Sequence, residues 1–335
     1  MLNEKNESAM DILMSKREIL RRLNSITIKP SGLKQRKYGI SVKYFSDNEQ
    51  NPYKRIDYQL TTDLIIDGHE GVLTIDKKDI HYNQHKADNI NEILGSSISK
   101  AFYPVKTHLN EKGLCTDEIL NHEEIKERWK KEKSIILEKY NSGSLDNFFL
   151  EADKKFSNKY HLEHSLQFDW FWNLFFHPKF INYGDTRQKE TALFLSVVPY
   201  QFPLKFSGIQ TIHKIPTDFH SFTIDFQSRE QKAHPYFISK KHKASNSFMT
   251  LKVVFDLDLY HHFPMHICAD FEVFSKDQFG NKISIKKIKY TQFQQNTEDF
   301  KQMRLSNTSP FITGGLIVSE PNKWGFYKNK YENDW

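Results

Sequence analysis

The residues best suited to chemistry are a histidine and several carboxylates that alternate along one predicted strand. His266, Asp270 and Glu272 share one face of this strand, and Asp256 or Asp258 could stand opposite them across a hairpin. Imidazole and carboxylate groups are suitable ligands for a divalent ion. The same residues are also ordinary on the solvent side of an amphipathic strand. Since neither a ligand spacing nor supporting partners are visible, His266, Asp270 and Asp256 are metal candidates only, and we predict no cofactor.

Asp169 is a further candidate, because it lies within an almost wholly apolar segment. Asn173 follows it one helical turn later on the same face. A desolvated carboxylate has a raised pKa and could act as a general acid or base. Alternatively, Asp169 marks the one solvent-facing edge of a helix, or it pairs with a lysine. A hydrolase that uses Asp169 or the His266 face is therefore one hypothesis for this chain.

Two histidines, His161 and His164, flank Glu163 just before the same apolar segment. In the metalloprotease motif, two histidines four positions apart share a helical face and the glutamate directly follows the first. The three-residue spacing found here does not match that arrangement. We interpret these residues as the polar start of a helix.

Common catalytic and nucleotide-binding motifs are absent from the sequence. It contains neither a glycine-rich phosphate loop nor a G-x-S-x-G nucleophile elbow. Its two cysteines, Cys115 and Cys268, are far apart and outside any metal-ligand spacing, which argues against a disulfide framework and a zinc ribbon. We therefore predict no catalytic residue and favour a non-enzymatic protein in a reducing compartment.

The charge of the chain comes mainly from lysine. The 335 residues carry a formal net charge of +6, but only nine of the 48 basic residues are arginine. Planar recognition of phosphates and guanine edges favours arginine, so we predict a lysine-rich surface and no nucleic-acid partner. No apolar run has signal-peptide length or the roughly 18 residues of a membrane span. The sequence predicts a cytoplasmic protein without a membrane span.

Two parts of the chain have the alternating pattern of β-strands. Apolar and polar residues alternate over 56–66. They alternate again over 249–259, and a matching run follows over 265–273, which is typical of an antiparallel meander. We predict an α+β fold with two antiparallel β-rich halves around a central helical segment. The expected divisions are an amphipathic N-terminal helix over 1–24, a β-rich part over 25–120, a helical segment over 121–182, an antiparallel sheet over 183–293 and an aromatic tail over 294–335.

The middle of the chain predicts several elements in detail. A helix is expected over 90–102, followed by a β-hairpin with strands at 103–109 and 114–120. Asn121 then has the position of a helix N-cap, and Glu124 completes a capping box.

Two later segments are apolar on more than one side. Residues 162–176 form a helix that is apolar almost all the way round, so it must be buried. Residues 193–198 are apolar on both faces, which predicts a central strand of a sheet.

The two ends of the chain supply candidate partner-binding residues. The N-terminal helix has one apolar face, and the tail holds too many aromatic residues for a free linker. Each segment could pack on its own protein or contact a neighbour. The candidate residues are Ile12, Leu13, Leu20, Trp324, Phe326, Tyr327 and Trp335.

The segment from Tyr103 to Lys133, YPVKTHLNEKGLCTDEILNHEEIKERWKKEK, resembles a stretch found in uncharacterised proteins of Bacteroidetes-type bacteria. Some of these proteins lie near contractile, type VI-like secretion genes. The resemblance covers less than a third of the chain, and it implies a structural, adaptor or cargo-binding role at a secretion apparatus. It transfers no catalytic residue, because it describes a capped helix start. The residues that carry it are Asn121, Glu123, Glu124, Ile125, Arg128 and Trp129.

The sequence thus favours a non-enzymatic adaptor or assembly protein that binds another protein or a second copy of itself. One alternative is a carrier for an apolar ligand, in which curved sheets enclose an aromatic cavity plugged by the helix over 162–176. The other alternative is a secreted effector or hydrolase.

Overall fold

The computed structural model describes residues 35–295, except 47–48, 68–69, 111, 117, 141–142, 215–216, 218–220, 239–245 and 259–261. The N-terminal helix predicted for 1–24 lies outside these residues. The tail beyond residue 295 also lies outside them. All seven candidate partner-binding residues belong to one or the other of these two segments, so they too lie outside the described residues.

One antiparallel sheet contains every strand of the described residues. Strands make up 47% and helices 27% of this part of the chain. The order across the sheet is β4-β3-β2-β1-β12-β11-β10-β8-β7-β6, with β5 beside β3 and β9 beside β10. The strands are β1 (Gln35–Ser46), β2 (Lys54–Asp67), β3 (Glu70–Tyr82), β4 (His85–Lys86), β5 (Val105–Leu109), β6 (Gln188–Leu195), β7 (Leu204–Ile212), β8 (Ser221–Ser228), β9 (Gln231–Lys232), β10 (Ser247–Asp258), β11 (Pro264–Lys276) and β12 (Lys282–Gln294).

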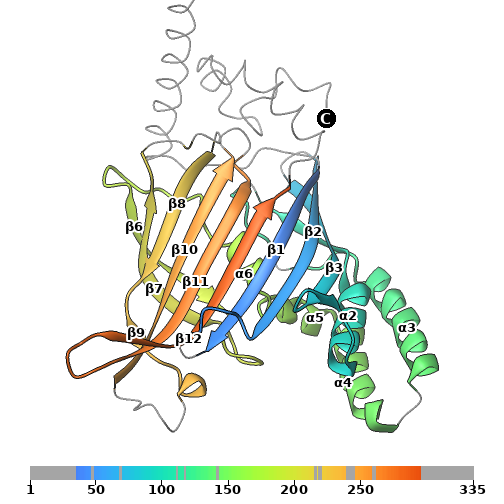
Figure 1. Ribbon diagram of the computed structural model, residues 1–335. Coiled ribbons are helices and arrows are strands. Elements are labelled where there is room, and N and C mark those ends of the chain that lie inside the picture. Colours follow the sequence, from blue (N-terminus) through green and yellow to red (C-terminus); the bar gives the residue numbers. More distant parts are fainter. Residues whose placement is uncertain are drawn as a thin grey trace, which may run out of the picture.

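The predicted α+β fold, with two β-rich halves around a central helical segment, was wrong. β1 pairs along its length with β12, from Tyr38 opposite Gln294 to Ser46 opposite Lys286. This pairing joins the N-terminal strands to the C-terminal meander, so both groups belong to one sheet (Figure 1). An alternating pattern identifies a strand but not its partner. A pairing between the two ends of the described chain therefore leaves no local trace in the sequence.

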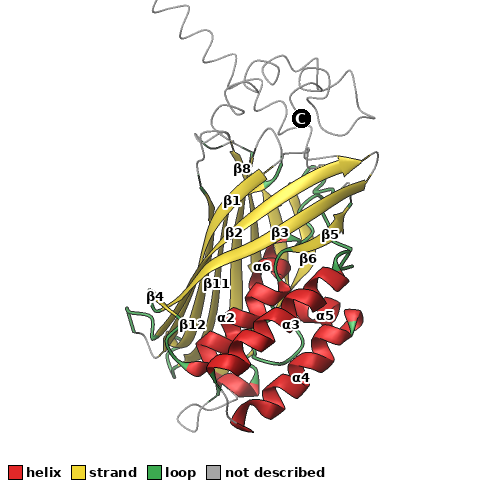
Figure 2. Ribbon diagram, turned by 90° about the vertical axis from the view of Figure 1, so that its right-hand side faces the viewer, coloured by secondary structure: helices red, strands yellow, loops and turns green. Residues whose placement is uncertain are grey.

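The helices lie to one side of the sheet and on its inner face. Figures 1 and 2 show four of them, α2 to α5, gathered along one flank beyond β3, and α6 behind the sheet. No helix of the described residues is both long and apolar enough to cross a bilayer. The helices are α2 (Ile90–Phe102), α3 (His122–Lys139), α4 (Asp146–Ser157), α5 (Lys159–Leu166) and α6 (Trp170–Phe175), with 3-10 turns η1 (Gly143–Leu145) and η2 (Pro235–Phe237).

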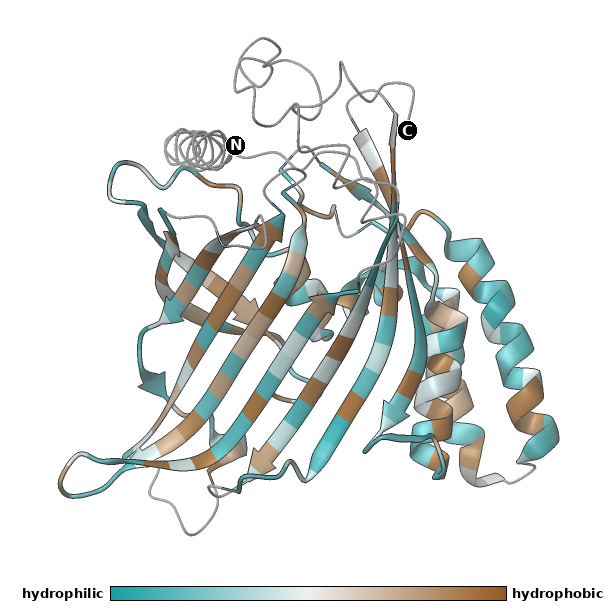
Figure 3. Ribbon diagram, turned by 45° about the horizontal axis from the view of Figure 1, so that its top comes forward, coloured by the Kyte–Doolittle hydropathy of each residue, from teal (hydrophilic) through white to brown (hydrophobic). Residues whose placement is uncertain are grey.

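Alternation along the strands gives the sheet an apolar inner face. On β10, Leu251, Val253 and Phe255 are buried, whereas Lys252 and Val254 between them are exposed on the outer face. Figure 3 shows the same exchange of hydrophobic and hydrophilic residues along neighbouring strands. Successive side chains of a strand point to opposite faces, so each strand adds an apolar row to the inside of the curve.

The local predictions around β5 were partly right. The helix over 90–102 is confirmed as α2. Of the predicted hairpin, a bridge between Leu109 and Cys115 forms, and the Thr116 and Leu120 N–H groups donate to the carbonyls of His108 and Lys106; β5 also pairs with β3. Asn121 makes no capping hydrogen bond with its side chain. Its Oδ1 accepts from the Lys106 backbone N–H at 2.9 Å, so this amide ties α3 to β5.

Residues 193–198 were predicted as a central strand, but 193–195 are the end of β6, which lies at the edge of the sheet, and 196–198 follow the strand. This segment is apolar on both faces although only its inner face is covered. The inner face packs against α6, and Trp170 Nε1 donates to the Ser196 carbonyl at 2.7 Å. On the outer face, Phe194 remains 53% exposed.

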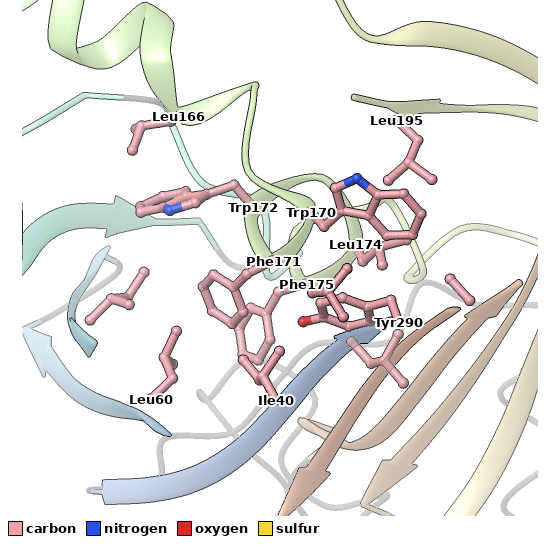
Figure 4. Packing of buried hydrophobic residues seen from close by; sticks show 14 of the residues in the cluster. Ile40, Leu60, Leu166, Trp170, Phe171, Trp172, Leu174, Phe175, Leu195 and Tyr290 are labelled. Carbon is pink, nitrogen blue, oxygen red and sulfur yellow. The ribbon is translucent and has the colours of Figure 1, made fainter. Parts of the chain in front are cut away.

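The predicted single helix over 162–176 is broken into α5 and α6, and its burial is confirmed for α6. The rings of Phe171 and Phe175 lie 4.8 Å apart, Trp170 stacks on Tyr290 at 6.1 Å, and Tyr38 meets Phe175 edge-on. Figure 4 shows this aromatic group over the strands of the sheet. Helix α6 is therefore the centre of the hydrophobic core.

Buried polar groups close the C-terminal end of α6. Lys179 Nζ donates to the carbonyls of Phe175 at 2.6 Å and His177 at 2.9 Å, which would otherwise be unsatisfied at the helix end. Burial lowers the pKa of Lys179 to about 7. His177 stacks on Phe255 and donates through Nε2 to Gln210 Oε1 at 2.7 Å. Burial, together with the nearby charge of Lys179, lowers the pKa of His177 to about 3.

We expect acid to destabilise the protein through His177. Because the folded pKa of about 3 lies below the ordinary 6.5, unfolding takes up a proton between these values. The free energy of unfolding should fall by up to about 1.4 kcal/mol for each pH unit below 6.5. Lys179 contributes little to this pH dependence of the free energy of unfolding, because it is protonated in both the folded and the unfolded state well below pH 7. Urea unfolding of wild type and His177→Gln between pH 7 and pH 5 measures the difference.

The matched control for this experiment is His161→Gln, since His161 is exposed. Its pH dependence should follow the wild type, whereas that of His177→Gln should be flatter. Parallel curves for wild type and His177→Gln would contradict a neutral, buried imidazole.

Candidate functional site

The metal candidates lie on the outer face of the sheet, and the structure does not gather them into a ligand set. Asp256 on β10 pairs in register with His266 on β11. Asp270 stands opposite Lys252 and lies 3.8 Å from the ammonium of Lys287. The described residues hold no group of three or more histidine, cysteine or acidic side chains that could bind a metal ion.

Asp258 is separated from this outer row, because the strand register shifts between Asp256 and Leu257. It is fully buried, and one of its carboxylate oxygens lies 3.7 Å from the Arg36 guanidinium. Cys268 lies on the outer row, with its Sγ 3.3 Å from His266 Nε2. Burial raises the pKa of Cys268, so its thiol is not activated as a nucleophile.

Asp169 caps the N-terminus of α6. Its Oδ1 accepts from the Phe171 backbone N–H at 2.8 Å, and its Oδ2 accepts from Lys77 Nζ at 3.1 Å. Of the sequence hypotheses, this geometry matches a carboxylate paired with a lysine. The break between α5 and α6 follows from the same residue, since aspartate is a preferred N-cap and starts a new helix.

Lys77 reaches Asp169 through a cluster of buried tyrosines. Its ammonium lies 4.0 Å from the centre of the Tyr58 ring and 5.7 Å from that of Tyr103. The Tyr103 hydroxyl accepts from Trp172 Nε1 at 3.0 Å. Burial, and secondarily the charge of Asp169, raises the pKa of Tyr58 and Tyr103 well above 10. Both phenols therefore stay neutral, and the cluster holds α6 to β2 and β3.

A groove of about 650 Å³ runs beside α5. It contains Glu163 and His164, which sequence analysis assigned to a polar helix start. Lys159 joins the two carboxylates of the groove, 2.9 Å from Glu118 and 3.7 Å from Glu163. The hydrogen bond from Lys159 holds the pKa of Glu118 below its ordinary value. The groove is lined by Thr116, Glu118, Lys159, Tyr160, Glu163, His164 and Gln167.

An aromatic rim, defined here as Tyr160, His164, Phe168 and Phe202, borders the groove. His164 stacks on Tyr160 at 5.9 Å and meets Phe202 edge-on at 5.4 Å and Phe168 at 6.0 Å. Tyr160 is 67% exposed and Phe202 is 68% exposed. Tyr200, in the same loop as Phe202, is 99% exposed. Large rings therefore gather at the surface next to a polar groove.

The groove is better suited to binding than to bond-making. Its one lysine is engaged by two carboxylates, and His164 makes ring contacts on both sides. This site was not predicted from the sequence, because Glu118 and Phe202 come from distant segments. The available signal was the aromatic loop between Pro199 and Pro203, which carries exposed rings without strand pairing.

We expect Asp169→Ala to lower the free energy of unfolding by about 1 to 2 kcal/mol, through loss of the cap. Asp169→Asn should lower it less, because an amide oxygen still accepts from Phe171. Asp185→Ala, in an exposed turn, serves as the control and should leave stability unchanged. Chemical denaturation measures all three variants. Equal losses for Asp169→Ala and Asp169→Asn would instead give the main role to the charge pair with Lys77.

Comparisons with known proteins give no family. No protein-family profile matches the chain, and no curated protein matches it. One solved structure, titled "Lipid-protein interactions in lipovitellin", is similar with a TM-score of 0.39 and 7% identity, over 79% of this chain and 25% of that one. This chain thus spans about a quarter of that protein's length.

Two structures of the CurJ dehydratase of curacin polyketide synthase are less similar. One has a TM-score of 0.10 at 10% identity over 78% of this chain and 76% of that one. The other, an inactive H978F mutant in complex with a compound, has a TM-score of 0.09 at 11% identity over 80% of this chain and 77% of that one. At these values none of the three similarities supports a fold family or a function, so the function is argued from the chain's own geometry.

Proposed function

We propose that this chain is a non-enzymatic binding protein that holds a segment of another protein in the groove beside α5. The observation that carries the proposal is the aromatic rim next to a polar groove, with Tyr160 and Phe202 about two-thirds exposed. Binding sites for protein segments combine apolar rings that lose contact with water and a few polar groups that fix orientation.

The rim supplies the affinity in this proposal. Burying a large apolar side chain is worth about 1.5 to 3 kcal/mol. His164 contacts Tyr160, Phe168 and Phe202, so the rings are already held before a partner arrives. Such pre-organisation lowers the entropy cost of binding.

The groove supplies the orientation. Glu118 and Gln167 offer acceptor oxygens at the surface, and Glu163 is fixed by the Ile119 backbone N–H at 3.0 Å. Lys159 links the two carboxylates and leaves the groove with one net negative charge. A partner segment with an apolar side chain next to a backbone donor or a cation would fit both parts.

The resemblance of the segment 103–133 to proteins encoded near type VI-like secretion genes suggests which partners to try first. We propose an adaptor role there, in the cytoplasm.

We expect Tyr160→Ser with Phe202→Ser to abolish partner capture. When the protein is mildly crosslinked in native cells and then immobilised, it should retain a partner. Loss of the two anchor rings should reduce the amount of partner retained by roughly tenfold or more. Phe194→Ser is the matched control, since Phe194 is similarly exposed on the outer face of β6. The proposal fails if every captured protein is retained equally by the double variant.

A second candidate is a carrier for an apolar ligand, favoured by how α6 covers the inner face of the sheet. This helix has six residues, and one of its ties to the sheet is the partly exposed pair of Asp169 and Lys77. Movement of α6 would uncover an aromatic surface that includes Tyr38 and Tyr290.

Native mass spectrometry of protein purified without detergent tests the carrier. A carrier should show a mass excess that organic extraction removes, and the stripped protein should take up a fatty-acid probe. A ligand-free mass together with no uptake of the probe would eliminate this candidate.

A further inference from the structure

One face of α5 presents an aromatic ring and oxygen acceptors side by side. Tyr160, Glu163 and His164 fall at i, i+3 and i+4, and Gln167 follows at i+7 directly after the helix, so their side chains line the same side of the groove. Tyr160 stacks on His164 at 5.9 Å and stays 67% exposed, which leaves much of its ring open. A ligand that enters the groove therefore meets an aromatic ring next to polar groups.

Three polar side chains of the groove are each anchored through one atom and keep an oxygen open. Glu163 Oε1 accepts from the Ile119 backbone N–H at 3.0 Å, and Glu118 Oε1 accepts from Lys159 Nζ at 2.9 Å. Gln167 donates through Nε2 to a carbonyl of α5 at 2.8 Å. Within the described residues, the other side-chain oxygen of each glutamate and the amide oxygen of Gln167 accept no hydrogen bond. The groove therefore offers fixed acceptors to a ligand that carries several donors.

The charge of the groove has the same bias. The carboxylates of Glu118 and Glu163 share the ammonium of Lys159, at 2.9 Å and 3.7 Å, so these three groups carry one net negative charge. Lys159 is the one lysine among the described residues that line the groove, and both carboxylates already engage it. An anionic ligand would therefore meet no unpaired cation, whereas one added cation would neutralise the three charged groups.

We propose that the groove recognises an arginine side chain of the partner segment. This inference rests on the proposed function and names the side chain by which the partner is read. The guanidinium stacks on the ring of Tyr160 and donates to the open oxygens of Glu118 and Glu163. It is planar and has five N–H donors, so it can contact a ring face and two carboxylates at once. A lysine ammonium has no flat face, and a proline side chain has no donor, so both satisfy less of this groove.

Two matched peptides test the proposal with the full chain. Acetyl-Leu-Arg-Leu-amide should bind, because its arginine reaches the carboxylates while a leucine contacts the aromatic rim. Acetyl-Leu-citrulline-Leu-amide has nearly the same shape but no charge, and it should bind about tenfold more weakly. Ligand-observed saturation-transfer NMR measures both affinities.

Substitutions in the groove should move the affinity for the arginine peptide in opposite directions. Glu118→Gln and Glu163→Gln each remove a charge but keep the shape, and each should weaken its binding about tenfold while leaving the citrulline peptide unchanged. Lys159→Met leaves both carboxylates without their ammonium and should tighten binding of the arginine peptide several-fold. Glu151→Gln is the matched control, because Glu151 also pairs with a lysine, Lys154, but lies on α4 outside the groove.

Three outcomes would overturn the proposal. One is equal binding of the two peptides, and another is an affinity for the arginine peptide that Glu118→Gln, Glu163→Gln and Lys159→Met all leave unchanged. The third is tighter binding of acetyl-Pro-Pro-Leu-Pro-amide than of the arginine peptide, which would assign the groove to a proline-rich segment. Matching melting temperatures of the variants and the wild type exclude a folding defect as the cause.

The arginine inference and the proposed function fail in different ways. If partner capture needs the rings of Tyr160 and Phe202 but the arginine peptide does not bind, the binding role stands and the arginine is wrong. If the arginine peptide binds as expected but capture is indifferent to the two rings, the groove reads arginine and the role in partner capture is wrong.

Discussion

Burial of α6 against the inner face of the sheet is the constraint on which the rest of the structure depends. A sheet whose order runs from β4 to β6 along an open path leaves its apolar inner face to be covered by something else. Trp170, Phe171 and Phe175 provide this cover. A helix of six residues cannot satisfy most of its own backbone groups, so both ends need partners in the interior. Asp169 meets this need at one end and Lys179 at the other.

The same constraint positions the candidate binding groove. The chain must turn inward at Asp169 to place α6, so α5 stays outside and keeps a solvent-facing side. Phe168 lies at this turn and remains at the surface beside His164. The segment before α3 then packs along α5, where the Ile119 N–H donates to Glu163. The groove is therefore the space beside α5, which stays at the surface while α6 enters the core.

Sequence patterns predicted the elements of this protein better than their arrangement. The alternation over 56–66 and 249–259 corresponds to β2 and β10, and the helix over 90–102 was found because its period and cap are local properties. The pairing of β1 with β12 was not predictable, since it joins residues from opposite ends of the described chain. Residues 193–198 were misplaced because one face of β6 packs on α6 while the other carries an exposed phenylalanine, Phe194, so an edge strand is apolar on both faces.

Candidate sites were harder to predict than strands, because a site depends on which segments meet. His164 was noticed in the sequence, but its partner Phe202 comes from a loop 38 positions further along the chain, and only the fold brings the two rings together. The composition is rich in aromatic residues, which predicts a strong core but does not say which rings stay outside. The structure divides them: Phe171 is fully buried, whereas Phe202 and Phe279 are mostly exposed. A ring that is exposed next to fixed polar or charged groups costs solubility and adds nothing to the core. His164 already holds Phe202 in place, and the proposed binding role rests on this pre-organisation.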